Sequence, residues 1–536
     1  MKRYRLDNIK LTPPIGEERG AITQYLKRKL RVEKDAVTDL TILRRSLDAR
    51  KKPELRYVYS AAFSLRDAAA EKRILKLGAL PFREEKVEAP PVLKRPADDK
   101  RPLIVGSGPA GLFCAYVLAR SGLAPIVVER GDCMEERDRA VNAFWEGGAL
   151  DPESNVSFGE GGAGTFSDGK LYSQAADREG FRAEVLRTFV RFGADGDILY
   201  DSHPHIGTDV LKRVVVEMRR EIIKLGAEFR FRCRFLEPLT ADGRICGAKL
   251  LQEGKETEQK CGALILCTGH SARDTFQNLY RFGIRMEAKP FAVGYRVQHP
   301  QSLIDEAQYG AEHEKKELPP AAYKLTARAS SGRGVYSFCM CPGGYVVNAS
   351  SEEGLLAVNG MSYRGRASGN ANSAIVATAG PELFGNELFA GMEFQRRIEQ
   401  AAFAAGGGKI PLESLGDFKN GAEALHRGFE ARVKGESCYS SLRGILPAAL
   451  EEDILEAFGM FGTKIRGFDS DDALLAGVES RTSSPLRILR GENAQGSVTG
   501  LFPCGEGAGY AGGITSAAAD GIRTANFVIQ YCVNFC

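Results

Sequence analysis

Three glycines at a fixed spacing and one distant acid are the residues best suited to hold a dinucleotide. Gly106, Gly108 and Gly111 lie between a predicted buried strand and a predicted helix. The first glycine permits a tight turn, the second lets the backbone approach a pyrophosphate, and the third lets helix and strand pack closely. Glu129 ends the next predicted strand, where an acid can accept both hydroxyls of an adenosine ribose. This unit predicts a Rossmann-type βαβ fold that binds a dinucleotide.

Three further segments favour FAD over a nicotinamide cofactor. Residues 159–170 form a glycine-rich stretch able to run flat along a cofactor, and a buried strand at 264–267 ends in Thr268-Gly269. Near the C-terminus a strand ends in Gly505-Glu506 and is followed by a helix. An acid at that turn can accept a ribityl hydroxyl, and the start of the helix can stabilise negative charge at the flavin N1/O2 edge. We therefore predict FAD, held non-covalently in an extended form.

The predicted cofactor-binding residues come from all of these segments. They are Gly106, Gly108, Pro109, Ala110, Gly111, Glu129, Arg130, Gly162, Gly164, Thr165, Ser167, Asp168, Gly169, Lys170, Phe235, Thr268, Gly269, Gly505, Glu506, Gly512, Gly513 and Ile514.

Longer motifs resemble one family of the two-dinucleotide-fold, glutathione-reductase-like flavoproteins. The matching stretches are GEGGAGTFSDGKL (159–171), HPHIGTDVL (203–211), VYSFCMCPGG (335–344), NGMSYR (359–364), GVESRTSSPLRI (477–488) and LFPCGEGAGYAGGITSAAADGI (501–522). The chain is similar to the uncharacterised FAD-dependent dehydrogenases, also called NAD(FAD)-utilising dehydrogenases. The resemblance implies an FAD-binding fold with a large inserted domain and assigns no substrate. The wider superfamily often has Gly-Asp where this chain has Gly505-Glu506, and the extra methylene shifts the acceptor by about 1.5 Å.

The elements that must position these residues predict an α/β protein of several domains. The expected order is an N-terminal basic α+β domain, a linker, the first part of the FAD-binding domain, an inserted β-rich α+β substrate domain and the C-terminal part of the FAD-binding domain. The boundaries are 1–86, 87–102, 103–275, 276–490 and 491–536. Strands at 4–11, 37–47 and 55–65 and helices at 22–30 and 66–77 predict a ferredoxin-like N-terminal domain.

Three residues are candidates for catalysis. Arg481 stands among small hydroxyl residues just before the last FAD segment and could bind a substrate carboxylate or phosphate, as could Arg487; a surface salt-bridge pair is the alternative. His205 precedes an amphipathic helix and could act as an acid or base; the alternative is a structural turn histidine. Lys170 could lie beside the flavin ring or simply cover it.

The N-terminal domain raises the question of a nucleic-acid partner. Residues 1–100 hold 25 basic and 15 acidic residues, a charge of +10, whereas the whole chain carries +4. Arg44, Arg45, Arg50, Lys51 and Lys52 surround two predicted strands, so one rival function is a flavin-dependent RNA-modifying enzyme. A charge run is more often a solvated face, and the sequence has no aromatic pair typical of RNA binding. We expect a small-molecule substrate and no nucleic-acid partner.

The glycine and cysteine motifs also limit how an electron donor could reach the flavin. The chain has no second strand–GxGxxG–helix unit and no redox C-x2-C or C-x4-C beside the flavin segments, so NAD(P)H, if used, would dock transiently at the flavin. Cys339 and Cys341 form the closest internal pair; a non-catalytic FAD-bound redox sensor is therefore a second rival, and a buried structural pair the alternative. A His-x-His pair such as His203 and His205 more often serves packing and hydrogen bonding than metal binding, so we predict no metal site.

Composition narrows the class of protein further. Of the 536 residues, 43% are hydrophobic and 26% charged, which excludes a largely disordered chain. The N-terminus has no signal-peptide pattern, and no apolar run approaches the roughly 20 residues of a membrane helix. The scattered cysteines are typical of a reduced compartment, so we expect a cytoplasmic protein. The combined interpretation is an FAD-dependent dehydrogenase that transfers a hydride through flavin N5 to or from a small anionic substrate.

Overall fold

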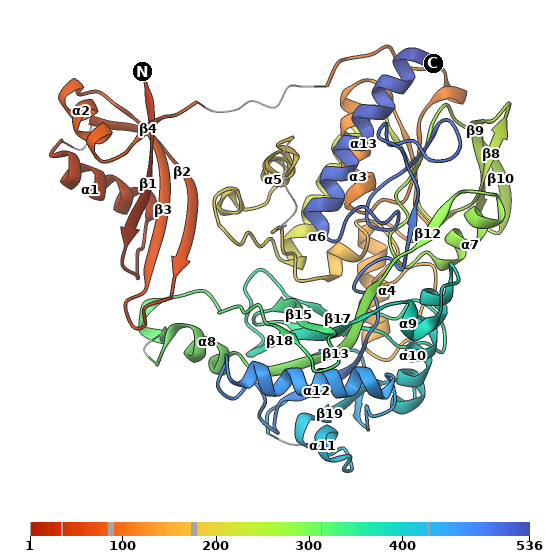
Figure 1. The fold of residues 1–536 in the computed structure, drawn as a ribbon. Coiled ribbons are helices and arrows are strands. Elements are labelled where there is room, and N and C mark those ends of the chain that lie inside the picture. Colours follow the sequence, from red (N-terminus) through yellow and green to blue (C-terminus); the bar gives the residue numbers. More distant parts are fainter. Residues whose placement is uncertain are drawn as a thin grey trace.

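The computed structural model describes residues 2–33, 36–83, 90–172, 179–311, 313–426 and 428–535 (Figure 1). Residues 87–89 of the predicted linker lie outside these ranges. The described part of the chain forms a small N-terminal domain, a domain built on a parallel sheet, and a large inserted domain.

The N-terminal domain is a four-stranded antiparallel sheet covered by two helices. Its elements are β1 (Arg3–Leu11), α1 (Glu18–Leu30), β2 (Val37–Asp48), β3 (Arg56–Leu65), α2 (Ala68–Lys76) and β4 (Leu80–Pro81). The strand order is β2-β3-β1-β4. Alternation along β1 places Tyr4 and Leu6 in the core with the buried face of α1, as the sequence pattern predicts, and a register shift after Leu6 brings Ile9 to the same side. The five predicted elements are confirmed; β4 is an addition, and the ferredoxin-like assignment stays a prediction.

The second domain is a five-stranded parallel sheet assembled from distant parts of the chain. Its elements are β5 (Leu103–Val105), α3 (Pro109–Arg120), β6 (Ile126–Val128), β7 (Glu228–Arg230), β11 (Leu264–Leu266), β24 (Leu501–Pro503) and α13 (Ile514–Phe535). The order is β24-β11-β5-β6-β7, and helix α13 packs against α3 on one face (Figure 1). Strands β24, β11, β5 and β6 are fully buried, as expected where helices or a second layer cover both faces of a parallel sheet. The prediction of a dinucleotide-type domain split in sequence is thereby confirmed at the level of topology.

Further elements surround this sheet. They are α4 (Met134–Trp145), α5 (Phe181–Arg191), α6 (Thr208–Lys224), the meander β8 (Cys233–Ala241), β9 (Arg244–Gln252) and β10 (Lys255–Lys260), and α7 (Arg273–Arg281). Two short strands, β12 (Met286–Ala288) and β23 (Leu486–Ile488), pair at the ends of the insertion. Leu486 and Ile488 pack in the same core cluster as Leu103 and Leu264, so both ends of the insertion pack with the parallel-sheet domain.

The inserted domain is built on a mixed seven-stranded sheet. The sheet contains, in order, β14 (Thr326–Arg328), β15 (Gly334–Cys341), β18 (Asn370–Ala379), β13 (Phe291–Pro300), β22 (Leu474–Glu479), β19 (Ile410–Ser414) and β21 (Ser437–Tyr439). Its helices are α8 (Gln301–Tyr309), α9 (Pro381–Phe384), α10 (Ala390–Gly406), α11 (Leu415–Asn420) and α12 (Ala448–Gly462). A smaller sheet contains β17 (Val358–Met361), β16 (Tyr345–Asn348) and β20 (Val433–Lys434).

The turn between β2 and β3 joins the N-terminal domain to the rest of the molecule (Figure 1). Leu55 is 1% exposed and belongs to the core of the inserted domain, where Leu47 also packs. Arg45 N donates to Tyr200 O at 2.6 Å, and its guanidinium binds Asp201. The N-terminal domain is therefore an integral part of the molecule, although it folds around its own core.

We predict that Leu55→Ala destabilises the whole protein by about 2–4 kcal/mol, because it leaves a cavity in a core shared by two domains. The measurement is the free energy of unfolding in urea, monitored at Trp145, which lies outside the N-terminal domain. Leu75→Ala is the matched control, since that side chain is 49% exposed on α2 and its truncation should cost less than about 0.5 kcal/mol. Equal effects of the two changes would contradict the shared core.

Candidate active site

One large cavity lies where the three domains meet. Its volume is about 1300 Å³, above the range of about 300–1,000 Å³ usual for small-ligand pockets. Its walls come from the β5–α3 turn, the loop 159–170, the ends of β8 and β11, and the start of α13. The inserted domain and the β2–β3 hairpin complete it. The cavity has room for a dinucleotide and a second molecule.

Most of the predicted cofactor residues line this cavity. They are Gly106, Gly108, Pro109, Ala110, Glu129, Arg130, Gly162, Gly164, Ser167, Asp168, Gly169, Lys170, Phe235, Thr268, Gly269, Glu506, Gly512, Gly513 and Ile514. The remaining three predicted residues do not line the cavity: they are Gly111, Thr165 and Gly505. The N–H of Gly505 donates to Asp520 at 2.8 Å, and Thr165 Oγ1 accepts from Arg137 at 2.9 Å.

The glycines of the β5–α3 turn do what their spacing predicts. A Cβ at Gly111 would lie 1.9 Å from Gly106 O, so only glycine lets the helix lie this close to the strand. Gly106 has φ +98°, and a Cβ there would lie 2.3 Å from Cys267 O. At Gly108, the N-cap of α3, a Cβ would have ordinary clearance of 3.7 Å from Gly162 Cα. Gly108 is thus required by no contact among the described residues, and its predicted role in the close approach of a phosphate stays a prediction.

Glu129 has an additional role that the sequence did not reveal. Its Oε2 accepts from the N–H and the hydroxyl of Ser107, each at 2.8 Å. Its Oε1 accepts from the N–H groups of Gly131 and Gly159 at 3.1 and 3.0 Å. A carboxylate has about four acceptor positions, so this side chain is saturated by its own loops while it faces the cavity. It fixes the turn and the glycine-rich loop to each other, and its predicted contact with a ribose stays a prediction.

Two polar side chains of the cavity fit a bound flavin dinucleotide. Thr268 Oγ1 is buried and has no hydrogen-bond partner among the described residues, although a buried hydroxyl normally has one. Burial raises the pKa of Glu506 to about 7, opposed by the attraction of Lys289. Its carboxyl group makes no hydrogen bond within the part of the chain that the structure describes. Both groups can bond ligand hydroxyls, as the sequence predicts for Glu506, and the N-terminus of α13 opens onto the same space.

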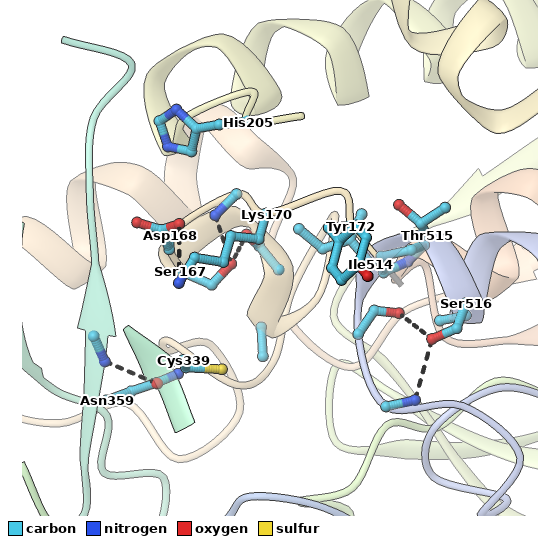
Figure 2. A pocket seen from close by; sticks show the side chains of 18 of the residues that line it. Ser167, Asp168, Lys170, Tyr172, His205, Cys339, Asn359, Ile514, Thr515 and Ser516 are labelled. Carbon is cyan, nitrogen blue, oxygen red and sulfur yellow. Dashed lines mark hydrogen bonds and ion pairs between the residues drawn. The ribbon is translucent and has the colours of Figure 1, made fainter. Parts of the chain in front are cut away.

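A charged cluster lies in the same cavity (Figure 2). Asp168 is 4% exposed, and its Oδ2 lies 3.7 Å from Lys170 Nζ and 3.6 Å from Arg366 Nη2. The Ser362 hydroxyl donates to Asp168 Oδ1 and lies 3.3 Å from His205 Nε2. Because the only proton of that hydroxyl goes to Asp168, His205 Nε2 is the donor to Ser362. The structure therefore brings Lys170 and His205, both candidates from the sequence, to one buried carboxylate.

The pKa values of this cluster give it a net positive charge. Burial opposes ionisation of Asp168, but Lys170, Arg366 and His205 outweigh it and lower the pKa of the carboxyl. Burial lowers the pKa of His205 to about 4; the carboxylate of Asp168 opposes this effect, and Arg366 and Arg364 add to it. At neutral pH the histidine is uncharged, and two cations share one carboxylate.

Ser362 and Arg366 escaped the sequence prediction because they lie in the inserted domain, far along the chain from Asp168. The NGMSYR motif at 359–364 contains the serine and was the available signal.

Arg481 reaches the cavity but is already paired. Its Nε and Nη2 bind Glu399 at 2.9 and 2.8 Å, and Arg273 binds the same carboxylate. The side chain of Glu399 is buried, and the two arginines hold its pKa far below the usual range against the opposing effect of burial. Arg487 does not line the cavity and pairs with Glu287 at 3.1 Å. The structure thus gives both arginines partners within the chain, whereas Lys170 and Arg366 share the single carboxylate of Asp168.

Cys339 and Cys341 are poor redox candidates in this geometry. Cys339 lines the cavity, and the surrounding protein raises the pKa of its thiol to about 11, opposed by Lys170 and Arg296. Cys341 is fully buried, which raises the pKa of its thiol further. Both thiols are protonated at neutral pH, and it is the thiolate that reacts.

Known proteins place the chain in a family. Residues 290–482 match the family model described as FAD-dependent protein, C-terminal domain-like, and residues 104–134 match the NAD(P)-binding Rossmann-like domain. Residues 3–64 match a domain of unknown function. An uncharacterised protein of Clostridium beijerinckii is 42% identical over 538 residues, which span 98% of each chain. The chain belongs to this family of FAD-dependent proteins.

The solved structures that resemble this flavoprotein share much less of its sequence than the Clostridium relative does. A flavin-dependent brominase triple mutant is 11% identical over 81% of this chain and 80% of its own, with a TM-score of 0.38. Glycine oxidase from Bacillus cereus is 10% identical over 80% of this chain and 97% of its own, with a TM-score of 0.35.

The described residues contain no candidate membrane span and no candidate metal cluster. No helix there is long and apolar enough to cross a membrane. No group of three or more His, Cys, Asp or Glu side chains in those ranges could hold a metal ion.

We predict that Gly108→Ala lowers the FAD affinity of the flavoprotein at least tenfold, because a methyl group would stand where the α3 N-terminus meets a phosphate. The measurement is the ratio of flavin to protein after dialysis, followed by titration with FAD. The free energy of unfolding of the flavin-free variant should change by less than about 1 kcal/mol. Gly196→Ala is the control, since its Cβ would meet open space. Undiminished FAD binding by Gly108→Ala would contradict the assignment.

Two buried histidines predict a loss of stability in mild acid. The folded-state pKa is about 4 for His205 and, because of burial, for His299, whose Nε2 bonds Phe468 O at 2.9 Å. The ordinary value is 6.5, so below pH 6.5 the unfolded chain binds more protons and the folded state loses stability as pH falls. Each histidine contributes a slope of about 1 kcal/mol per pH unit between pH 6.5 and 5.

Urea unfolding of the holoprotein at several pH values measures this slope. We expect His205→Gln and His299→Gln each to reduce it, and His203→Gln, at an exposed position, to leave it unchanged. An unaltered slope in the two buried variants would rule out the shifted histidines as its source.

Proposed function

We propose that the protein is an FAD-dependent oxidoreductase whose small substrate carries a carboxylate or another anionic group bound by Lys170 and Arg366. The observation that carries this proposal is the sharing of one buried carboxylate, Asp168, by two cations in the cavity that holds the dinucleotide motif. One negative charge cannot neutralise both cations, so an anionic ligand would complete the pairing. The FAD-dependent family and the oxidoreductase-type fold support the same class of reaction.

The residues of the chain have separate tasks in this proposal. FAD bound in the cavity would supply hydride transfer at flavin N5. Lys170 and Arg366 orient the anionic group, and Ser362 holds Asp168 in place. The N-terminus of α13 lines the cavity, and the first N–H groups of a helix have no partner within the helix; Glu506 offers an acceptor for a hydroxyl.

His205 is the proposed acid–base group. In the free enzyme its low pKa leaves it neutral and ready to accept a proton. An anion bound beside Lys170 and Arg366 would offset their charge and raise the pKa of His205 toward neutrality, where proton transfer is most efficient. NAD(P)H remains the proposed electron donor, docking transiently in the same cavity, because the sequence offers no second dinucleotide motif.

The rival functions gain no support from the geometry. Of the basic side chains proposed to hold RNA, Arg45 pairs with Glu18 and Asp201, Arg50 pairs with Asp48, and Lys52 donates to Ala307 O. The charged groups of Arg45, Arg50 and Lys52 therefore already have partners within the protein. The redox-sensor alternative needs a reactive thiolate, which the raised pKa values of Cys339 and Cys341 disfavour.

We predict that Lys170→Met and Arg366→Met each weaken butanoate binding by the holoprotein at least tenfold, because each removes one cation from the anion site. The measurement is a titration followed by the visible absorption of the flavin and by calorimetry. Arg487→Gln, outside the cavity lining, is the control and should bind butanoate normally.

Anaerobic mixing with NADH and with NADPH tests the reaction class in the same preparation. Loss of the visible flavin absorption with one nicotinamide is the expected result. Absence of reduction by both, together with unchanged butanoate binding in the two Met variants, would refute the proposal.

A further inference from the structure

The cavity continues beyond the charged cluster to the N-terminal domain. Leu47 of β2 and Tyr57 of β3 line it together with Lys170 and Arg366. A domain that only tethered a partner would not need to face the active-site cavity. Its presence in the wall indicates that it touches whatever the cavity holds.

Two links show that this outer wall adjoins the anion site. Tyr309, at the end of α8, is 9% exposed and lines the cavity with Tyr57 and Arg366. It also packs in the same apolar cluster as Leu55 and Leu47, so it continues the wall from the N-terminal hairpin toward the cationic pair.

The second link is a chain of ion pairs. Arg45 Nη2 lies 3.7 Å from Asp197, and Asp197 accepts from Arg364 Nη2 at 2.8 Å. Arg364 also donates to the backbone carbonyl of His205. The position of the N-terminal hairpin is thus fixed relative to His205 by charged groups on both sides of the cavity.

The outer end of the cavity is mainly apolar. Its walls include Leu47, Tyr57, Leu318, Pro319, Ala322 and Phe338. Of the charged side chains here, Glu317 and Lys324 are exposed at the rim, and Arg45 is paired with Asp197 and Asp201. A ligand reaching from Lys170 to Leu47 would pass from a cationic site to an apolar one.

We propose that the substrate is an amphipathic anion, with its carboxylate or similar group at Lys170 and Arg366 and an alkyl or aromatic body lying against Leu47 and Tyr57 of the N-terminal domain. This inference rests on the proposed function for the anionic end and adds the apolar end. It makes the N-terminal domain a part of the substrate-binding site that sets the length and character of the substrate.

A series of straight-chain carboxylates tests the proposal in the FAD-loaded protein. Butanoate, hexanoate, octanoate and decanoate are titrated by calorimetry and by flavin absorption. Each methylene buried against apolar wall tightens binding by up to about fourfold. Allowing for partial burial, we expect decanoate to bind at least about 50-fold more tightly than butanoate. Decylamine should bind at least tenfold more weakly than decanoate, because Lys170 and Arg366 repel a cation.

Two variants place the alkyl chain at the N-terminal wall. Leu47→Ala removes part of the apolar surface and should weaken decanoate binding about tenfold with butanoate binding unchanged. Leu47 also packs against the inserted domain, so Ala49→Phe, which enlarges a side chain instead of truncating one, provides a second test. It fills the same end of the cavity and should exclude decanoate while admitting butanoate. Leu75→Ala, exposed on α2 and away from the cavity, should leave the whole series unchanged.

The outcomes separate the two proposals. If butanoate and decanoate bind equally, or if both variants keep the full gain with chain length, the apolar site is refuted and the anion site stands. If no carboxylate binds to the FAD-loaded protein, the anion site fails and the amphipathic substrate fails with it.

Discussion

The buried carboxylate of Asp168 is the constraint on which the arrangement of this site depends. A carboxylate with 4% exposure must be paired, and here its partners come from the glycine-rich loop and from the inserted domain. Lys170 is two residues away in sequence, whereas Ser362 and Arg366 come from the segment after β17. Pairing this one charge therefore requires the inserted domain to close over the dinucleotide domain. Residues of both domains therefore line this end of the cavity.

A second buried carboxylate, that of Glu129, fixes the other end of the glycine-rich loop beside the dinucleotide motif. Glu129 is saturated by N–H groups from its own turn and from Gly159, so the glycine-rich loop has a fixed position before any ligand binds. Preorganisation of this kind lowers the entropy lost on binding. The two carboxylates together hold residues 159–170 from both ends, and this loop separates the dinucleotide motif from the charged cluster.

The signals that led from the sequence to this turn are local: three glycines at a fixed spacing between a buried strand and a helix. At Gly111 the steric reason also acts within a few residues, because a Cβ there would meet Gly106 O. The same reasoning could not find the pairing of Arg481 with Glu399 or of Asp168 with Arg366. Those partners are separated by long stretches of chain, and the register that joins them is set by packing in the inserted domain. Arg481 stood in a run with few charges nearby in sequence, which favoured a free guanidinium; its partner lies on α10.

The order of the strands in the parallel sheet has a consequence for how the protein is made. Strand β11 lies between β5 and β24, yet β24 is synthesised more than 200 residues after β11. At about 5–20 residues per second, the ribosome needs roughly 10–50 s to bridge that interval. During this time one edge of a wholly apolar strand has no neighbour, and the side chain of Leu55 also waits for its partners in the inserted domain. An unpaired apolar edge is a template for aggregation. The nascent chain therefore needs protection from aggregation until its last segment emerges. A shortened chain that ends before residue 501 would leave the β11 edge permanently unpaired.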